Sequence, residues 1–103
     1  MLTTLIYRSQ LNLSRPSTEL RELVERARIR NANLNITGVL LAKGSDVLQI
    51  LEGAEESVLK LFHKIRDDKR HSGVVELMRD YGPRRRFENV GMLLFDLQTQ
   101  SPK

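Results

Sequence analysis

Residues 36–51 read ITGVLLAKGSDVLQIL, and this stretch decides the fold. Two apolar runs, 36–41 and 47–51, flank the turn sequence Lys43-Gly44-Ser45-Asp46. Isoleucine, valine and leucine in short runs are typical of strands, whereas glycine and aspartate give a tight turn its backbone freedom. The stretch therefore predicts a β-hairpin.

Amphipathic segments on both sides of the hairpin predict two helices, because apolar residues recur at i, i+3, i+4 and i+7. The apolar positions of the first helix are Leu20, Leu23, Val24 and Ala27. Ser17 is its expected N-cap, and the helix is expected to end near Asn31 or Asn33. The apolar positions of the second helix are Val58, Leu61, Phe62 and Ile65.

Three further segments, 2–7, 74–78 and 90–95, predict strands. The expected order of elements is βαββαββ. Two helices that are each apolar on one face must cover a sheet, so the sequence predicts an α+β class in a ferredoxin-like arrangement.

Composition limits what this chain can be. Its 103 residues suffice for one domain, and the absence of cysteine excludes disulfides and thiolate chemistry. No apolar run approaches the roughly 18 residues of a membrane span, and no secretory signal opens the chain. Its two histidines are too few and too isolated to predict a metal site. We expect a cytoplasmic protein without membrane contact.

Positive charge is concentrated between residues 60 and 86, which hold nine basic and four acidic residues. Such an excess can meet an anion, although a solvated basic surface explains it equally simply. The run Arg84-Arg85-Arg86 is a weak signal for nucleic acid, because no aromatic residues surround it to stack on bases. A nucleic-acid partner is therefore not expected.

Three polar residues occupy apolar positions. Asn31 lies four residues beyond Ala27 on the apolar face of the first helix, although it could instead be a helix C-cap. Gln49 is central in an apolar strand, where its amide needs a polar partner such as a backbone carbonyl or a core hydroxyl. Tyr7 shares a strand face with Leu5, so its hydroxyl also needs a partner unless the ring is only half-buried packing.

Several separated motifs, in the right order, resemble the BLUF domain, a blue-light sensor that uses FAD. They are Leu5-Ile6-Tyr7-Arg8-Ser9, Asn31, Ile36-Thr37-Gly38-Val39-Leu40, Leu48-Gln49-Ile50-Leu51-Glu52-Gly53, Asp68-Lys69-Arg70-His71 and Arg85-Arg86-Phe87. The chain looks most similar to the sensor domains of enterobacterial BLUF–EAL proteins. The resemblance implies a sensor domain at 1–97 and a polar tail at 98–103.

The resemblance implies a mixed five-stranded sheet with two helices on one face and the flavin between the helices. Asn31 and Gln49 would hydrogen-bond the flavin, which is FAD in the family, with FMN or riboflavin possible in this pocket. The apolar slot would be lined by Leu23, Val24, Val39 and Ile65. The polar edge of the flavin and its ribityl phosphate would lie near Lys64, Asp68, Arg70 and His71.

The function implied by the resemblance is photochemical, without catalytic turnover. Light drives an electron and a proton from Tyr7, and Gln49 rearranges its amide. The absorption then shifts to the red, and the sheet passes the change through Met92. The signal would reach a fused effector or a signalling partner, and an open sheet face would favour a homodimer.

The chain departs from the family at three positions. Val90 stands where many members have tryptophan, and Ala42 and Val47 stand where an aromatic residue is usual. Loss of two rings beside the hairpin would weaken flavin binding. The alternative function is therefore a flavin-free BLUF-like module that binds other proteins.

Overall fold

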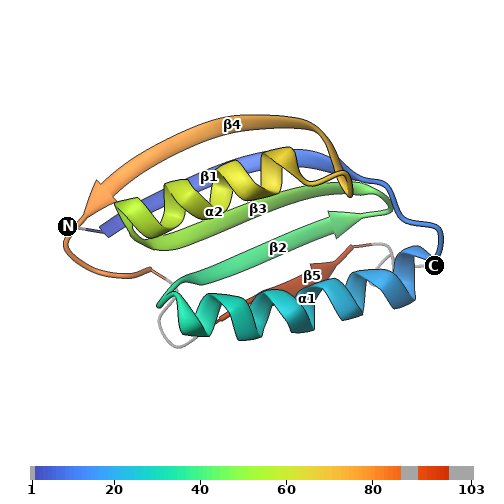
Figure 1. Ribbon diagram of the computed structural model, residues 1–103, viewed down its shortest axis with the longest axis horizontal. Coiled ribbons are helices and arrows are strands. Elements are labelled where there is room, and N and C mark those ends of the chain that lie inside the picture. Colours follow the sequence, from blue (N-terminus) through green and yellow to red (C-terminus); the bar gives the residue numbers. More distant parts are fainter. Residues whose placement is uncertain (1, 87–90, 98–103) are drawn as a thin grey trace.

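The computed structural model describes residues 2–86 and 91–97, and Val90 lies outside these ranges. One sheet and two helices make up the described chain (Figure 1). Its elements are β1 (Leu2–Leu11), α1 (Pro16–Asn33), β2 (Thr37–Lys43), β3 (Asp46–Ala54), α2 (Glu55–Asp67), β4 (His71–Gly82) and β5 (Leu93–Asp96). The predicted order βαββαββ and the α+β class are confirmed.

The strands lie in the order β4-β1-β3-β2-β5. β1 is antiparallel to both of its neighbours, β3 and β4, and β2 is antiparallel to β3. β5 runs parallel to β2, which makes the sheet mixed. The register places Tyr7 of β1 directly opposite Gln49 of β3, so two of the three anomalous polar residues are cross-strand partners.

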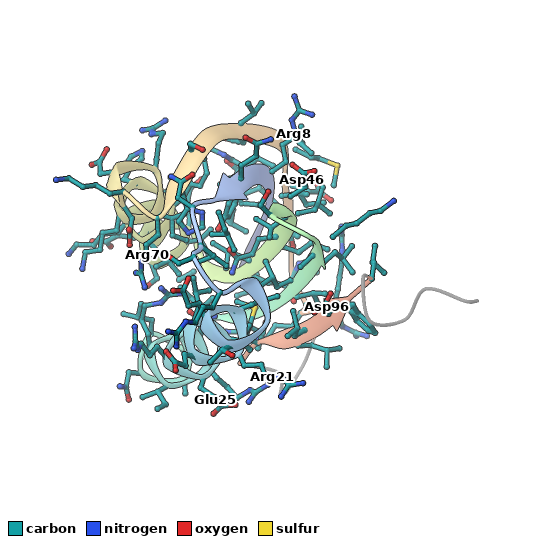
Figure 2. All side chains as sticks on the ribbon, turned by 90° about the vertical axis from the view of Figure 1, so that its right-hand side faces the viewer. Arg8, Arg21, Glu25, Asp46, Arg70 and Asp96 are labelled. Atoms are coloured by element: carbon teal, nitrogen blue, oxygen red, sulfur yellow. The ribbon has the colours of Figure 1, made fainter. Side chains whose placement is uncertain are left out.

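Both helices cover the same face of the sheet (Figure 2). α2 contacts β1, β3 and β4, whereas α1 contacts β2. All four predicted apolar residues of α2 are buried, as are Leu20, Val24 and Ala27 of α1, while Leu23 is partly buried against the core. The helical periodicity in the sequence therefore identifies the core correctly.

Two local predictions are wrong. α1 begins at Pro16, with Arg15 as its N-cap and no side-chain cap, so Ser17 does not cap it. Proline is favoured in the first helical turn because the N–H that it lacks has no partner there. β3 continues through Gly53 to Ala54, three residues beyond the apolar run 47–51 that predicted it. A Cβ at Gly53 would lie 3.2 Å from the Asn35 carbonyl oxygen, so glycine lets the strand pass close to that carbonyl.

The face of the sheet opposite the helices carries a row of apolar side chains. Side chains alternate between the two faces of a strand, so Val39, one residue from the helix-facing Leu40, lies on this opposite face. Val39 pairs with Leu93 on one side and Ile50 on the other, Ile50 pairs with Ile6, and Ile6 pairs with Met78. An unbroken apolar row therefore crosses all five strands.

Two of the three arginines at 84–86 hold the segment that follows β4 against Asn35 and β3. Arg85 donates to the carbonyl oxygens of Asn35 (2.6 Å) and Glu52 (3.0 Å). The backbone N–H of Arg86 donates to the buried Glu52 carboxylate (2.7 Å), and its guanidinium pairs with Asp80. These contacts give Arg85 and Arg86 a structural role in holding the segment that follows β4.

Candidate functional site

A chain of polar contacts crosses the centre of the helix-facing side. The Tyr7 hydroxyl donates to Gln49 Oε1, and Gln49 Nε2 donates to the Met92 sulfur at 3.7 Å. Tyr7, Gln49 and Met92 are all at most 4% exposed. The predicted burial of the Gln49 amide is confirmed, and its oxygen meets a core hydroxyl. Among the described residues its nitrogen contacts only a thioether, which is a weak acceptor.

Tyr7 keeps its proton firmly in this environment. Its ring packs against Phe62 of α2 at a centroid distance of 5.3 Å. Burial raises the pKa of the Tyr7 hydroxyl, and the positive charge of Arg30 opposes that rise only in part. The hydroxyl is therefore a hydrogen-bond donor to Gln49 at every physiological pH.

Asn31 points inward and is not the C-cap of its helix. Its side chain is fully buried, and Leu34 is the C-cap of α1. Asn31 Nδ2 donates to the Gly91 carbonyl oxygen at 2.8 Å, while Asn31 Oδ1 accepts from Arg30 Nε at 3.2 Å. An amide has two N–H donors and two acceptor lone pairs, so Asn31 retains capacity for further hydrogen bonds.

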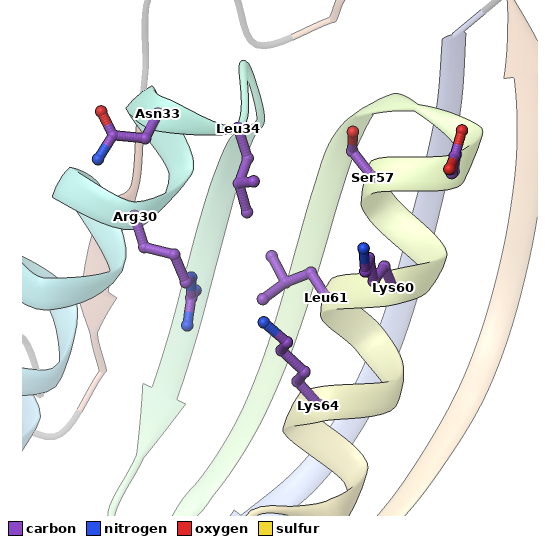
Figure 3. Close-up of a pocket in the computed structure, with 8 residues that line it drawn as sticks. Arg30, Asn33, Leu34, Ser57, Lys60, Leu61 and Lys64 are labelled. Atoms are coloured by element: carbon purple, nitrogen blue, oxygen red, sulfur yellow. The ribbon is translucent and has the colours of Figure 1, made fainter.

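A cleft of about 500 Å³ opens between the two helices (Figure 3). Arg30 of α1 and Lys64 of α2 point toward one another across it, with Leu61 between them. Lys60 adds a third cation, while Glu56 contributes one carboxylate to the lining. Its size and position, between helices with a few polar groups, are typical of a site for an organic cofactor, and its charge favours an anionic one.

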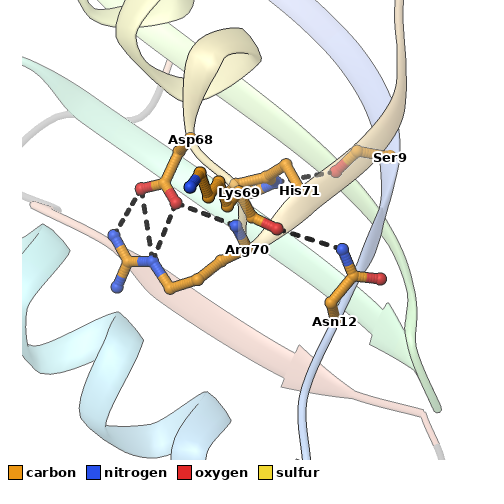
Figure 4. Close-up of polar contacts among 6 residues, drawn as sticks. All are labelled: Ser9, Asn12, Asp68, Lys69, Arg70 and His71. Atoms are coloured by element: carbon orange, nitrogen blue, oxygen red, sulfur yellow. Dashed lines mark hydrogen bonds and ion pairs between the residues drawn. The ribbon is translucent and has the colours of Figure 1, made fainter.

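The predicted residues Asp68, Arg70 and His71 gather at the far end of α2 (Figure 4). The Asp68 carboxylate accepts from the Arg70 guanidinium at 2.6 Å, and this bond lowers the pKa of Asp68 to about 2. His71 Nδ1 lies 3.0 Å from Ser9 Oγ. Burial lowers the pKa of His71, so a neutral imidazole is favoured. Arg30 interacts electrostatically with Tyr7 and His71, which links this end to the buried tyrosine.

The apolar residues predicted for the slot divide between the two faces. Val24 and Ile65 are buried in the helix-facing core, and Leu23 packs against it. Val39 does not belong there, because strand alternation puts it on the face away from Gln49. Ala42 and Val47, the departures from the family pattern, are cross-strand partners in the helix-facing core.

Three basic residues of the site were not predicted. Arg30 and Lys60 line the cleft, and Arg28 donates twice to the Met92 carbonyl oxygen, at 3.0 and 3.2 Å. Arg30 carried a signal that could have been used, because it adjoins Asn31 at the end of the apolar face. Arg28 carried none, since its acceptor lies 64 residues away in the sequence.

Comparisons with known proteins agree with this geometry. Residues 2–93 match the sequence profile of the BLUF family, described as sensors of blue-light using FAD. Over 98 residues the chain is 48% identical to the Blue light- and temperature-regulated antirepressor BluF of Escherichia coli (strain K12). That match covers 95% of this chain and 24% of the relative.

Solved structures give the same result. Klebsiella pneumoniae BlrP1, in a manganese/cy-diGMP complex, superposes with a TM-score of 0.87 at 52% identity over 96% of this chain and 25% of its own. A bacterial light-regulated adenylyl cyclase superposes with a TM-score of 0.92 at 34% identity over 99% of this chain and 30% of its own. The chain thus spans roughly a quarter of these relatives.

Proposed function

The chain belongs to the BLUF family of blue-light flavin sensors, and from this membership we propose that Tyr7 and Gln49 form its photoactive pair. The domain is a sensor module. In relatives named for cyclase or antirepressor activity, the matched region is a small part of a longer chain. Nothing observed favours the flavin-free alternative. The sensor is proposed to occupy residues 1–97, in the cytoplasm.

The donors and acceptors of the site suit a flavin. Within residues 2–86 and 91–97, the buried Gln49 nitrogen has only a sulfur partner, and Asn31 has spare hydrogen-bonding capacity. Both are amides, which match the alternating carbonyl and N–H groups of an isoalloxazine edge. Leu23, Val24 and Ile65 would contact its apolar part. A buried amide nitrogen with so weak a partner is the observation that carries the proposal.

The chain's own residues provide the switch. Bound flavin supplies blue-light absorption and an acceptor for an electron. Tyr7 is poised to release its proton along the existing hydrogen bond to Gln49 Oε1. Gln49 can then exchange the direction of its donor and acceptor, because its two ends differ only in that respect. Met92, in contact with Gln49 Nε2, would carry the change to β5.

The visible absorption spectrum, taken in the dark and after blue light, tests this function. We expect a flavin spectrum that shifts to the red and recovers in the dark. A flavin spectrum without a shift would point to a broken Tyr7–Gln49 switch. A colourless protein that takes up no added flavin would refute the proposal.

The cofactor is proposed to be FAD, held in part through its phosphates. Arg30, Lys60 and Lys64 line the cleft, and Asp68 with Arg70 and His71 would lie along the ribityl chain. Lysine ammonium groups bind phosphate as point charges. A solved structure of a relative, Klebsiella pneumoniae BlrP1, contains FMN. We therefore do not expect the adenosine part of FAD to be required for binding.

Removing the two lysines should weaken the binding of phosphorylated flavin but not of unphosphorylated flavin. In the double variant Lys60→Gln/Lys64→Gln we expect FMN to bind about tenfold more weakly, because two partly screened charges are lost. Riboflavin should bind almost as before. Fluorescence titration at low ionic strength measures both dissociation constants. Lys43→Gln, at the hairpin on β2, is the matched control. Equal weakening of both flavins would place the phosphate elsewhere.

The apolar row on the open sheet face is proposed to be covered by a second copy of the chain. Met78 and Leu93 at the two ends of the row are 44% and 42% exposed, Ile6 and Ile50 are partly exposed, and Val39 in the middle is buried. An extended apolar surface of this kind marks an interface, and one flat patch on each copy satisfies a two-fold axis. In longer relatives an effector region could use the same face.

Light scattering tests the dimer. We expect the mass of two chains at micromolar concentration, and of one chain in Met78→Glu. Ile29→Glu, on the exposed side of α1, is the control and should leave the mass unchanged, since Ile29 is 65% exposed away from the sheet. A single-chain mass for the unaltered protein over the whole concentration range would contradict the proposal.

A further inference from the structure

Two side chains at the end of α1 hydrogen-bond to the backbone immediately before β5. Arg28 donates through Nε and NH2 to the Met92 carbonyl oxygen, at 3.2 and 3.0 Å. Asn31, three residues further along the same helix face, donates to the Gly91 carbonyl oxygen at 2.8 Å. Two successive carbonyls are thus held by one helix, which fixes where the Met92 side chain begins.

Two glycines allow this close fit. A Cβ at Gly91 would lie 3.1 Å from both Arg28 Cγ and the Arg28 carbonyl oxygen, so the backbone at 91 rests directly on α1. A Cβ at Gly38 would lie 3.3 Å from Met92 Cε. Gly38 therefore leaves the space that the methionine methyl occupies, and a side chain there would push the thioether away from Gln49.

Arg28 is not part of the core. Its side chain is 46% exposed, and it also pairs with Glu25, one turn back on α1. The pair orients the guanidinium toward Met92 while leaving it in contact with solvent. A partly exposed arginine that donates twice to one distant carbonyl contributes position more than packing.

We propose that Arg28 is a positioning residue that keeps the Met92 sulfur against the Gln49 amide and thereby sets how long the light state lasts. The proposal rests on the proposed function, since it concerns the same amide. Return to the dark arrangement requires Gln49 to turn its amide beside Met92. When the Arg28 hydrogen bonds hold Met92 in place, its side chain obstructs the rotation of the amide. When those bonds are lost, Met92 can move aside and the amide rotates more easily.

The experiment compares three variants of the same helix with the unaltered chain. Arg28→Gln removes the guanidinium and both of its hydrogen bonds to the Met92 carbonyl oxygen. Arg28→Lys keeps the positive charge but replaces the two donors with one ammonium group. Arg26→Gln is the matched control, because in the part of the chain that the structure describes Arg26 makes only an exposed ion pair with Glu22. Dark recovery after a blue-light pulse is followed by absorption. The Met92 methyl resonance is followed by NMR in methionine-labelled protein, assigned with Met92→Leu.

We expect Arg28→Gln to recover about threefold to tenfold faster, as loss of part of one charge-assisted hydrogen bond would produce. Arg28→Lys should recover at an intermediate rate. The Met92 methyl resonance should move toward that of free methionine in Arg28→Gln, and thermal midpoints should stay equal among the arginine variants. Arg26→Gln should match the unaltered chain in every measurement.

Two results would overturn the inference. One is an Arg28→Gln protein whose recovery and methyl resonance equal those of Arg26→Gln. The other is acceleration to the same extent in both variants, which would reflect a general effect of charge on α1. Failure of the proposed function is distinguishable, because the unaltered chain would then show no red shift. The methyl resonance would still decide whether Arg28 holds Met92.

Discussion

Replacing Gln49 with leucine is expected to abolish the light-induced red shift while leaving a flavin-bound protein. Leucine has nearly the volume of glutamine but no donor or acceptor to exchange. The Tyr7 hydroxyl loses its partner at the same time. The proton then has no hydrogen-bonded path, and the amide that would rearrange is gone. Difference absorption after blue light measures the result.

The same variant has a cost in stability that must be kept apart from its effect on the switch. A buried hydroxyl without a partner costs about 1–3 kcal/mol. Gln10→Leu makes the same chemical change on β1, where the amide donates to the exposed Asp46 carboxylate. We expect Gln10→Leu to keep the full shift. A Gln49→Leu protein that still shifts to the red would remove Gln49 from the switch.

Much of the site could be predicted because its residues break simple periodic patterns. The helical repeat carried forward from Ala27 places Asn31 inward, and the structure buries it fully. An amide in the middle of an apolar strand requires a partner, and the facing strand supplies Tyr7. These positions follow from local periodicity together with the cost of unpaired polar groups.

The prediction that Val39 lines the slot between the helices was wrong, and the sequence itself contains the reason. The turn places Lys43 opposite Asp46, so Leu40 stands opposite Gln49 and shares its face. Val39, one residue earlier, must then point the other way. The register of the hairpin, and not the apolar character of valine, decides which side chain can reach the space between the helices.

Other features could not be predicted, because they depend on contacts between distant segments. Arg85 bonds carbonyls of Asn35 and Glu52, and Arg28 bonds the carbonyl of Met92. A carbonyl acceptor leaves no mark in the sequence, since every residue has one. Each of these arginines therefore looks like ordinary surface charge until the chain is folded.

Gly38→Ala is expected to be the most destabilising small substitution in the sheet. A Cβ there would lie 2.7 Å from the Ile50 carbonyl oxygen, closer than such atoms approach in real structures. That oxygen belongs to the backbone of β3, so it cannot move without shifting the strand that carries Gln49. Forcing atoms into a filled core costs typically about 1–3 kcal/mol. The free energy of unfolding of a domain is roughly 5–15 kcal/mol in total.

The thermal midpoint measures this effect, and Gly82→Ala provides the control. No atom of the described residues lies within 4 Å of a Cβ at Gly82, at the end of β4, so the thermal midpoint of Gly82→Ala should change by little. For Gly38→Ala we expect a fall of about 10 °C. The variant also pushes on Met92, so any folded fraction should show a displaced Met92 methyl resonance. Equal midpoints for the two variants would mean that β2 and β3 can separate at Gly38 without cost. The close packing of Met92 against Gly38 would then be contradicted as well.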